Sequence, residues 1–191
     1  MVVKFRASAA VAAFLLSATA GSAPAAAQTI AQPAAPASDS AFLQMTSSLA
    51  LLQAKLGKLA GDKASSPAVR EFGKRMVTDY SKANEALATA AKQAAYPAPV
   101  MLRQHQQLYD RFLRMGGSSF DKKYMAEAVN DHGLAVNLYR QESESGRVAS
   151  LKQLASSMLP TAEEHLTLAT ETARSVGADV TATASRDKQG S

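Results

Sequence analysis

The sequence predicts an all-α protein, and three observations support this class. The chain has 191 residues, 47% hydrophobic and 19% charged, which is typical of a globular domain. Aromatic residues make up only 6%, tryptophan is absent and alanine is abundant, a composition that favours helices over sheets. Apolar residues also recur three and four positions apart in four long segments, which is the spacing of a one-sided helix. Four such helices can bury their apolar stripes together as a four-helix bundle, and one extra short helix is expected beside it.

The first two long helices have clear start and stop signals. The first is expected over residues 40–61, and one face carries its apolar residues: Phe42, Met45, Leu49, Leu52, Leu56 and Leu59. The second is expected to begin with Ser66 as its capping residue and Pro67 at its first helical position, and to end near Ala95. Pro97 and Pro99 then prevent the helix from continuing, because proline has no backbone N–H to donate.

The second half of the chain predicts one short and two long helices. The short one covers 100–115 and ends at a pair of glycines, which suit a helix C-terminus. The third long helix is expected to begin with a capping box formed by Ser118 and Asp121 and to end near Gly146. The fourth runs over about 148–176, and Pro160 is expected to bend it.

The amino-terminal segment predicts export. Lys4 and Arg6 precede an apolar run, and small residues lead to an Ala-x-Ala site at 25–27, so 1–27 is expected to be a signal peptide cut before Gln28. A cut after Ala23 is the alternative. The run is shorter than the about 20 residues that a membrane-spanning helix needs. A mature protein without a transmembrane segment, in the periplasm or the cell envelope, is therefore expected.

The rest of the domain organisation follows from composition. Residues 28–39 are rich in alanine and proline and predict an extended tether, 40–176 form the helical bundle, and 177–191 form a polar, flexible tail. The chain has no cysteine, which excludes disulfides, a thiolate metal site and lipid attachment at a cysteine. The formal net charge is only +5, and the basic residues are spread among acidic ones, so nucleic-acid binding is not expected.

Two histidines lie on apolar helix faces and are the candidate metal ligands. His132 and His165 come from different helices, as do the ligands of carboxylate-bridged di-iron bundles. Those bundles use Glu-x-x-His, however, and the residues three positions before these histidines are Val129 and Ala162. A site for one transition metal ion, completed by a carboxylate at the edge of the stripe, Asp131 or Glu164, remains an alternative.

The favoured interpretation of these two histidines is structural. Tyr80, Tyr124 and Tyr139 are expected to point inward, and their hydroxyls would need partners, which His132 and His165 could provide. The third histidine, His105, is assigned to the surface.

The other sequence motifs do not predict a catalytic site. The chain has no cysteine nucleophile, no Gly-x-Ser-x-Gly motif and no phosphate-binding glycine loop after a strand, so no complete catalytic constellation is recognised. Gly133 costs a helix about 1 kcal/mol relative to alanine. Either close helix packing or room for a molecule beside His132 could explain it.

Several runs, taken in order and spacing, resemble one bacterial family. They are residues 56–60, 67–84 and 120–124, followed by His132 and the Leu159-Pro160 pair with His165-Leu166. This pattern is similar to the envelope family catalogued as domain of unknown function 4142, over about residues 40–175. The resemblance implies a ferritin-like fold and a periplasmic or outer-membrane location.

Two departures from the family pattern concern the candidate metal site. Many members have histidine where this chain has Tyr80, and glutamate where it has Gln53. Tyrosine and glutamine are poorer ligands for transition metals, so the resemblance implies a weakened site in this chain, with only His132 and His165 carried over.

The sequence thus predicts a secreted, ferritin-like helical bundle without catalytic activity or cofactor, which acts as an envelope or stress-associated binding or interaction module. The alternative is a metal-binding, degenerate di-iron-like protein that uses His132 and His165. A third hypothesis is a carrier protein that binds a small ligand in space beside Gly133. An envelope protein or a second copy of the chain is the expected kind of partner.

Overall fold

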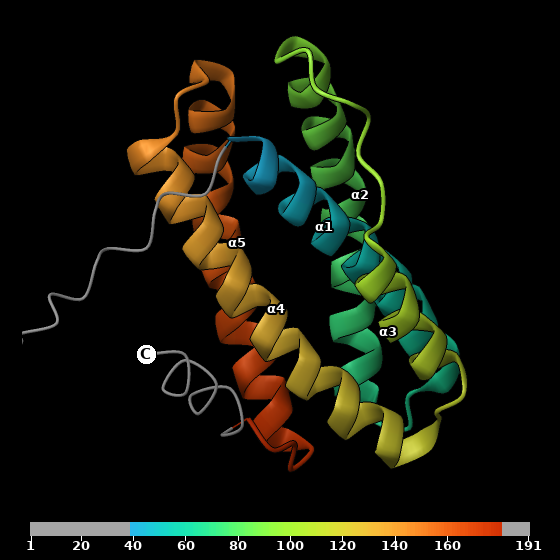
Figure 1. Ribbon diagram of the computed structural model, residues 1–191. Coiled ribbons are helices and arrows are strands. Elements are labelled where there is room, and N and C mark those ends of the chain that lie inside the picture. The colour runs from blue at the N-terminus through green and yellow to red at the C-terminus, as the bar shows by residue number, and fades with distance from the viewer. Residues whose placement is uncertain (1–38, 181–191) are drawn as a thin grey trace, which may run out of the picture. The chain divides into compact units, whose positions relative to one another are not determined.

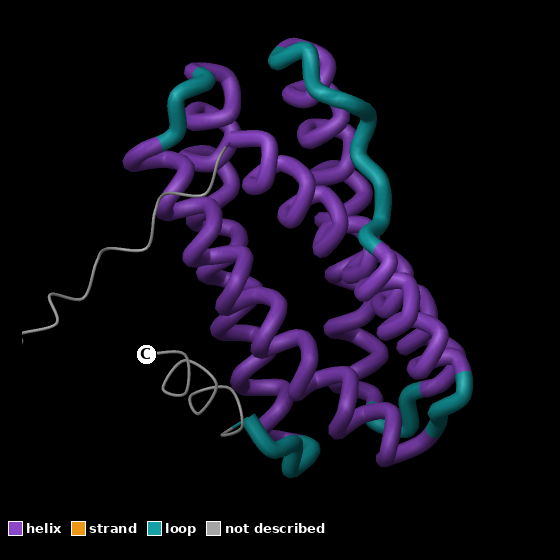
Figure 2. Tube along the Cα trace, in the orientation of Figure 1, coloured by secondary structure: helices purple, strands orange, loops and turns teal. Residues whose placement is uncertain are grey.

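The computed structural model describes residues 39–180, which form five α-helices and no strand (Figure 1, Figure 2). The helices are α1 (Asp39–Lys63), α2 (Pro67–Gln93), α3 (Arg103–Leu113), α4 (Gly117–Ser145) and α5 (Ala149–Ser175). The all-α class is confirmed. The predicted signal peptide, almost all of the tether and most of the tail lie outside the described residues.

The four long helices pack around a common core, and α3 lies against α1. α1 pairs with α2, α4 pairs with α5, and the two pairs meet where α1 contacts α4 and α2 contacts α5. The connection after α2 runs back beside the helices to reach α3 (Figure 2). Pro160 lies inside α5, which continues on both sides of it. None of the described helices is both long and apolar enough to cross a membrane.

The predicted apolar stripes form the core. The largest side chains that are completely buried come from α1, α2, α4 and α5, and they include Phe42, Leu52, Leu56, Met76, Leu87, Phe120, Tyr124, Met125 and Leu151. Phe72 meets the edge of Tyr124 at 5.8 Å between ring centroids, and Phe112 of α3 meets Phe120 at 5.7 Å. Burial of these side chains is the main stabilising force of the fold, since the chain has no disulfide.

α1 and α2 approach each other closely at two glycines, Gly57 and Gly73. A Cβ atom added to Gly57 would lie 2.5 Å from the carbonyl oxygen of Gly73, and one added to Gly73 would lie 2.7 Å from the carbonyl oxygen of Gly57. Real side-chain carbons do not come this close to backbone oxygen atoms. The crossing therefore requires glycine at both positions.

α2 begins at Pro67 as predicted, but its capping hydrogen bonds come from another helix. Ser66 occupies the N-cap position, but its side chain makes no capping hydrogen bond. Instead, the carboxylate of Asp121 in α4 accepts hydrogen bonds from the backbone N–H of Ser65 (3.1 Å) and Ser66 (2.8 Å) and from the Ser65 hydroxyl (2.5 Å). Asp121 is therefore not part of a capping box for its own helix, which has Gly116 as its N-cap. A carboxylate beside the N-terminus of α2 is also favoured by the helix dipole.

Asp39 caps the N-terminus of α5, as Asp121 caps that of α2, at the opposite end of the bundle. Its carboxylate accepts hydrogen bonds from the backbone N–H of Arg147 (3.1 and 3.2 Å) and Val148 (2.7 Å), directly before α5. The first residue of α1 thus holds the turn between α4 and α5.

Glu142 lies near this turn and gives the fold a pH dependence. The residue is 2% exposed, and its Oε1 atom has no hydrogen-bond partner. Burial, and secondly the negative charge of Asp39, raise the pKa of Glu142 to about 7, and Lys152 opposes this only in part. The folded protein therefore binds the proton of Glu142 more tightly than the unfolded chain does.

We expect the Glu142 contribution to stability to be full below pH 4.5 and to disappear as the pH rises through 7, because an acid whose pKa is raised by folding favours the folded state when protonated. Melting temperatures of the wild type and Glu142→Gln from pH 5 to 8 measure this. The variant should lose less stability than the wild type over that range. Glu144→Gln, at an exposed position two residues away, is the matched control and should follow the wild type.

Candidate functional site

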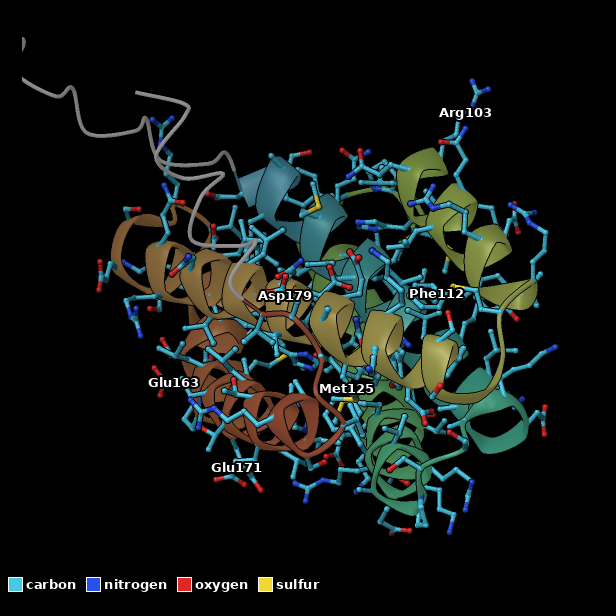
Figure 3. The ribbon with its side chains drawn as sticks, turned by 90° about the horizontal axis from the view of Figure 1, so that it is seen from below. Arg103, Phe112, Met125, Glu163, Glu171 and Asp179 are labelled. Atoms are coloured by element: carbon cyan, nitrogen blue, oxygen red, sulfur yellow. The ribbon has the colours of Figure 1, made fainter. Side chains whose placement is uncertain are left out.

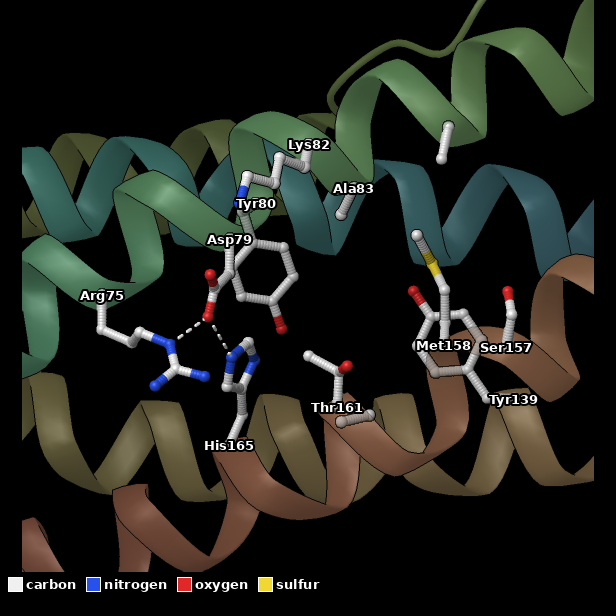
Figure 4. A pocket seen from close by; sticks show the side chains of 12 residues that line it. Arg75, Asp79, Tyr80, Lys82, Ala83, Tyr139, Ser157, Met158, Thr161 and His165 are labelled. Carbon is white, nitrogen blue, oxygen red and sulfur yellow. Dashed lines mark hydrogen bonds and ion pairs between the residues drawn. The ribbon is translucent and has the colours of Figure 1, made fainter.

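A cavity of about 370 Å³ lies between α2 and α5, with one residue of α4 in its wall (Figure 4). Its lining residues are Arg75, Asp79, Tyr80, Lys82, Ala83, Ala86, Tyr139, Ser157, Met158, Thr161, Ala162 and His165.

One end of the cavity is charged. The Asp79 carboxylate accepts hydrogen bonds from the Arg75 guanidinium and from Nε2 of His165, the latter at 2.9 Å (Figure 4). Arg75 also donates to Glu164 at 3.2 Å. Burial alone would raise the pKa of Asp79, but its hydrogen bonds and charge interactions with Arg75 and His165 outweigh burial and lower that pKa. Asp79 is therefore an anion at neutral pH, and it is hydrogen-bonded to the Arg75 guanidinium and the His165 imidazole.

The hydrogen bond between Asp79 and His165 shows which nitrogen of His165 carries a hydrogen. An ionised carboxylate can only accept, so Nε2 of His165 must carry the hydrogen. The imidazole is 2% exposed. Its other nitrogen, Nδ1, takes no part in this hydrogen bond.

His132 is held through the opposite ring nitrogen, Nδ1. Its side chain is completely buried, and Nδ1 donates to the backbone carbonyl of Ala128 at 2.6 Å. Burial lowers the pKa of His132 to about 4, and the hydrogen bond to Ala128 opposes this only in part. The ring is therefore neutral, and its Nε2 atom is a buried acceptor without a partner.

The structure brings the two histidines together, as the sequence suggested. Their ring centroids are 5.5 Å apart, and the ring planes are perpendicular. The ring of Tyr80 lies 5.8 Å from that of His132 and 5.5 Å from that of His165.

The predicted hydrogen bonds between tyrosine hydroxyls and histidines were wrong for the described residues. Tyr80, Tyr124 and Tyr139 are buried as expected, but the imidazoles bond to Ala128 and Asp79 instead. The Tyr124 hydroxyl has no partner, and burial raises its pKa.

His105 was wrongly assigned to the surface. It is 7% exposed, and a 2.5 Å hydrogen bond joins its Nδ1 to the hydroxyl of Ser48 in α1. The same hydroxyl accepts the backbone N–H of Leu102 at 2.7 Å. His105 and Phe112 are seven residues apart and therefore share one face of α3. His105 meets Ser48 of α1, and Phe112 meets Phe120 of α4.

The carboxylates proposed as edge ligands have other partners. Asp131 accepts a hydrogen bond from Gln53 Nε2 at 2.7 Å, and Glu164 binds Arg75. Burial, and secondly the charge of Glu127, raise the pKa of Asp131 well above its ordinary value. Among residues 39–180, no group of three or more histidine, aspartate or glutamate side chains is arranged to hold a metal ion.

Sequence reasoning missed Arg75 and Asp79. Their spacing of four residues is the usual one for an ion pair on a helix surface. That signal was present, but it does not reveal that the carboxylate also reaches His165 on another helix. Gly133 does not line the cavity, and a Cβ atom added there would meet nothing within 4 Å, so close packing does not explain this glycine.

Two solved structures share the fold of this chain. One is CopM in its Cu(II)-bound form, with a TM-score of 0.58 and 14% identity, covering 72% of this chain and 97% of CopM. The other is a Streptomyces coelicolor protein described as secreted and as DUF305, with a TM-score of 0.61 and 16% identity, covering 76% of this chain and 96% of that one.

The family relationship comes from the sequence itself. None of the curated proteins is significantly similar to this chain in sequence. The family described as domain of unknown function DUF4142, however, matches residues 23–172, which include all of α1 to α4 and most of α5. The chain therefore belongs to the DUF4142 family.

Proposed function

We propose that this protein is a secreted, ferritin-like four-helix bundle with one extra short helix, and that it acts as a non-catalytic, envelope or stress-associated binding module. The cavity between α2 and α5 is its binding site for a small ligand. This cavity is the observation that carries the proposal, since it combines apolar walls with polar groups at one end, as ligand sites usually do.

The lining of the cavity favours binding over catalysis. Apart from Lys82, its ionisable groups at the charged end are already bonded to one another, because Asp79 binds both Arg75 and His165. The Ser157 hydroxyl donates to the carbonyl of Leu154 at 2.7 Å, so it is not activated by a base. This arrangement positions groups for recognition without preparing a nucleophile.

The same lining suggests the chemistry of the ligand. Tyr80, Tyr139 and Met158 provide apolar surface, and Lys82 adds a positive charge at an exposed edge. A small, mostly apolar molecule with one acidic group fits these features best. Export is supported by the predicted signal segment and by the shared fold with the secreted protein from Streptomyces coelicolor.

The fluorescent probe 1-anilinonaphthalene-8-sulfonate, which is apolar and carries one acidic group, tests this site. We expect the mature protein to bind it saturably with one site per chain. Ala83→Leu should weaken binding at least about tenfold, because the larger side chain fills the cavity. Ala88→Leu, at an exposed position on the same helix, is the matched control and should bind like the wild type. Equal binding by all three proteins would contradict the cavity as the site.

Metal binding through His132 and His165 is the second candidate function. A degenerate di-iron centre is poorly supported, because such centres need bridging carboxylates, whereas Asp131 and Glu164 are bound to Gln53 and Arg75. One neighbour in fold, CopM, is a Cu(II)-bound protein. The two histidines lie side by side, which favours a site for one ion rather than two.

A further inference from the structure

We infer that Nε2 of His132 and Nδ1 of His165 form a binding site for a single copper ion at the inner side of the cavity. The inference rests on the second candidate function and deepens it by naming the ligand atoms and the ion. Four observations carry it: the ring nitrogens, the ring spacing, the donor types and the access from the cavity.

The first observation concerns the nitrogens. Histidines that bind metal ions commonly donate their other N–H to a carboxylate or a backbone carbonyl, which holds the ring and fixes the free nitrogen. His165 does this with Asp79 and His132 with Ala128. Each ring is therefore held through one nitrogen, and the other nitrogen is the one that could bind an ion. For His132 that atom, Nε2, is a buried acceptor without a partner, whereas such acceptors are normally satisfied in native proteins.

The second observation is the distance between the rings. A metal–nitrogen bond of about 2.0 Å places an ion about 3 Å from the centre of an imidazole ring, so two rings on one ion have centroids about 5 to 6 Å apart. The centroids of His132 and His165 are 5.5 Å apart. The observed spacing lies within the range of two rings that share an ion.

The third observation is the chemistry of the donors. The two imidazoles would supply borderline nitrogen ligands, and the carboxylate of Asp79 is engaged by Arg75 and His165. Hard ions such as Mg²⁺, Ca²⁺ and Mn²⁺ prefer oxygen ligands, whereas nitrogen ligands favour Cu²⁺ over the other divalent ions of the first transition row.

The fourth observation is access. Tyr80 and His165 both line the cavity, which opens between α2 and α5, so an ion and its remaining water ligands can enter from there. His132 lies behind them in the core, where it is completely buried.

The test is a titration of the metal-free mature protein with Cu(II) in competition with a chelator, together with electron paramagnetic resonance of the complex. We expect one tight equivalent per chain and nitrogen splitting from two imidazoles. His132→Gln and His165→Gln should each abolish tight binding. His105→Gln is the matched control, because His105 is also buried but bonds to Ser48, and it should bind copper like the wild type.

The variant Asp79→Asn tests the supporting hydrogen bond. It should keep one copper equivalent but bind it about 10-fold to 100-fold more weakly, because the group that orients His165 is altered. Circular dichroism checks that each variant is folded. If His132→Gln does not fold, the His165→Gln titration and the two-nitrogen signal of the wild type decide the question.

The outcomes distinguish the failure of the copper site from the failure of metal binding in general. Copper binding that survives both His132→Gln and His165→Gln, or that His105→Gln also abolishes, would overturn the site. Tighter binding of Zn(II) than of Cu(II) through the same two histidines would overturn the choice of copper and leave metal binding intact. A protein that binds neither ion would remove the second candidate function as well.

Discussion

Replacing Gly57 with alanine is expected to lower the free energy of unfolding by about 3 kcal/mol. The new Cβ atom would lie 2.5 Å from the carbonyl oxygen of Gly73 and 3.2 Å from the Cβ of Met76. The first of these neighbours is backbone, which cannot turn aside as a flexible side chain can. α1 and α2 must therefore separate, and this loss exceeds the about 1 kcal/mol that alanine gains over glycine as a helix former.

Urea denaturation followed by circular dichroism measures this effect, and Gly133→Ala is the matched control. Gly133 also lies within a helix, but a Cβ atom there meets nothing within 4 Å. The control should therefore be more stable than the wild type by up to about 1 kcal/mol. Opposite signs for the two glycines are the expected result. If Gly57→Ala were as stable as the wild type, the close crossing of α1 and α2 would be wrong.

Replacing Asp121 with alanine should have the second largest effect, a loss of about 2 kcal/mol. The substitution leaves the backbone N–H groups of Ser65 and Ser66 without their acceptor in a partly buried turn. The carboxylate is itself 2% exposed, so its space would be left incompletely filled. The connection between α1 and α2 should loosen first.

Two measurements separate this cause from a general loss of stability. Thermal unfolding gives the size of the effect, and hydrogen exchange of the Ser65 and Ser66 amides shows whether the turn itself loses protection. Asp62→Ala removes an exposed carboxylate close to the same turn and is the control. Unchanged amide protection at Ser65 and Ser66 in Asp121→Ala would show that Asp121 does not cap α2.

The positions of the helices could be predicted because helix formation follows local patterns. The expected starts and ends of the four long helices lie within about two residues of those in the structure, which is the usual uncertainty of helix ends. The apolar stripes became the core for the same reason, since side chains three and four residues apart share a face whatever lies opposite. His132 and His165 were placed inward on this basis, and they are buried.

Polar partners could not be predicted in the same way. Ser66 and Asp121 both had the sequence context of helix caps, yet Asp121 serves the turn before α2 and not its own helix. His105 has polar neighbours in the sequence, but the side of α3 that faces α1 carries it into the interior, next to Ser48. In each case the partner is more than fifty residues away along the chain.

The sequence by itself determined the helical class, the approximate helix ends, the apolar faces and the inward position of two histidines. Tertiary structure decided which hydrogen-bond partners those histidines have, which carboxylate caps which helix, and where a cavity remains between α2 and α5. The physical reason is that helix periodicity acts over one or two turns, whereas the rotation and offset of packed helices depend on how whole surfaces fit together. Gly57 and Gly73 illustrate this, because their need for glycine arises only when α1 crosses α2.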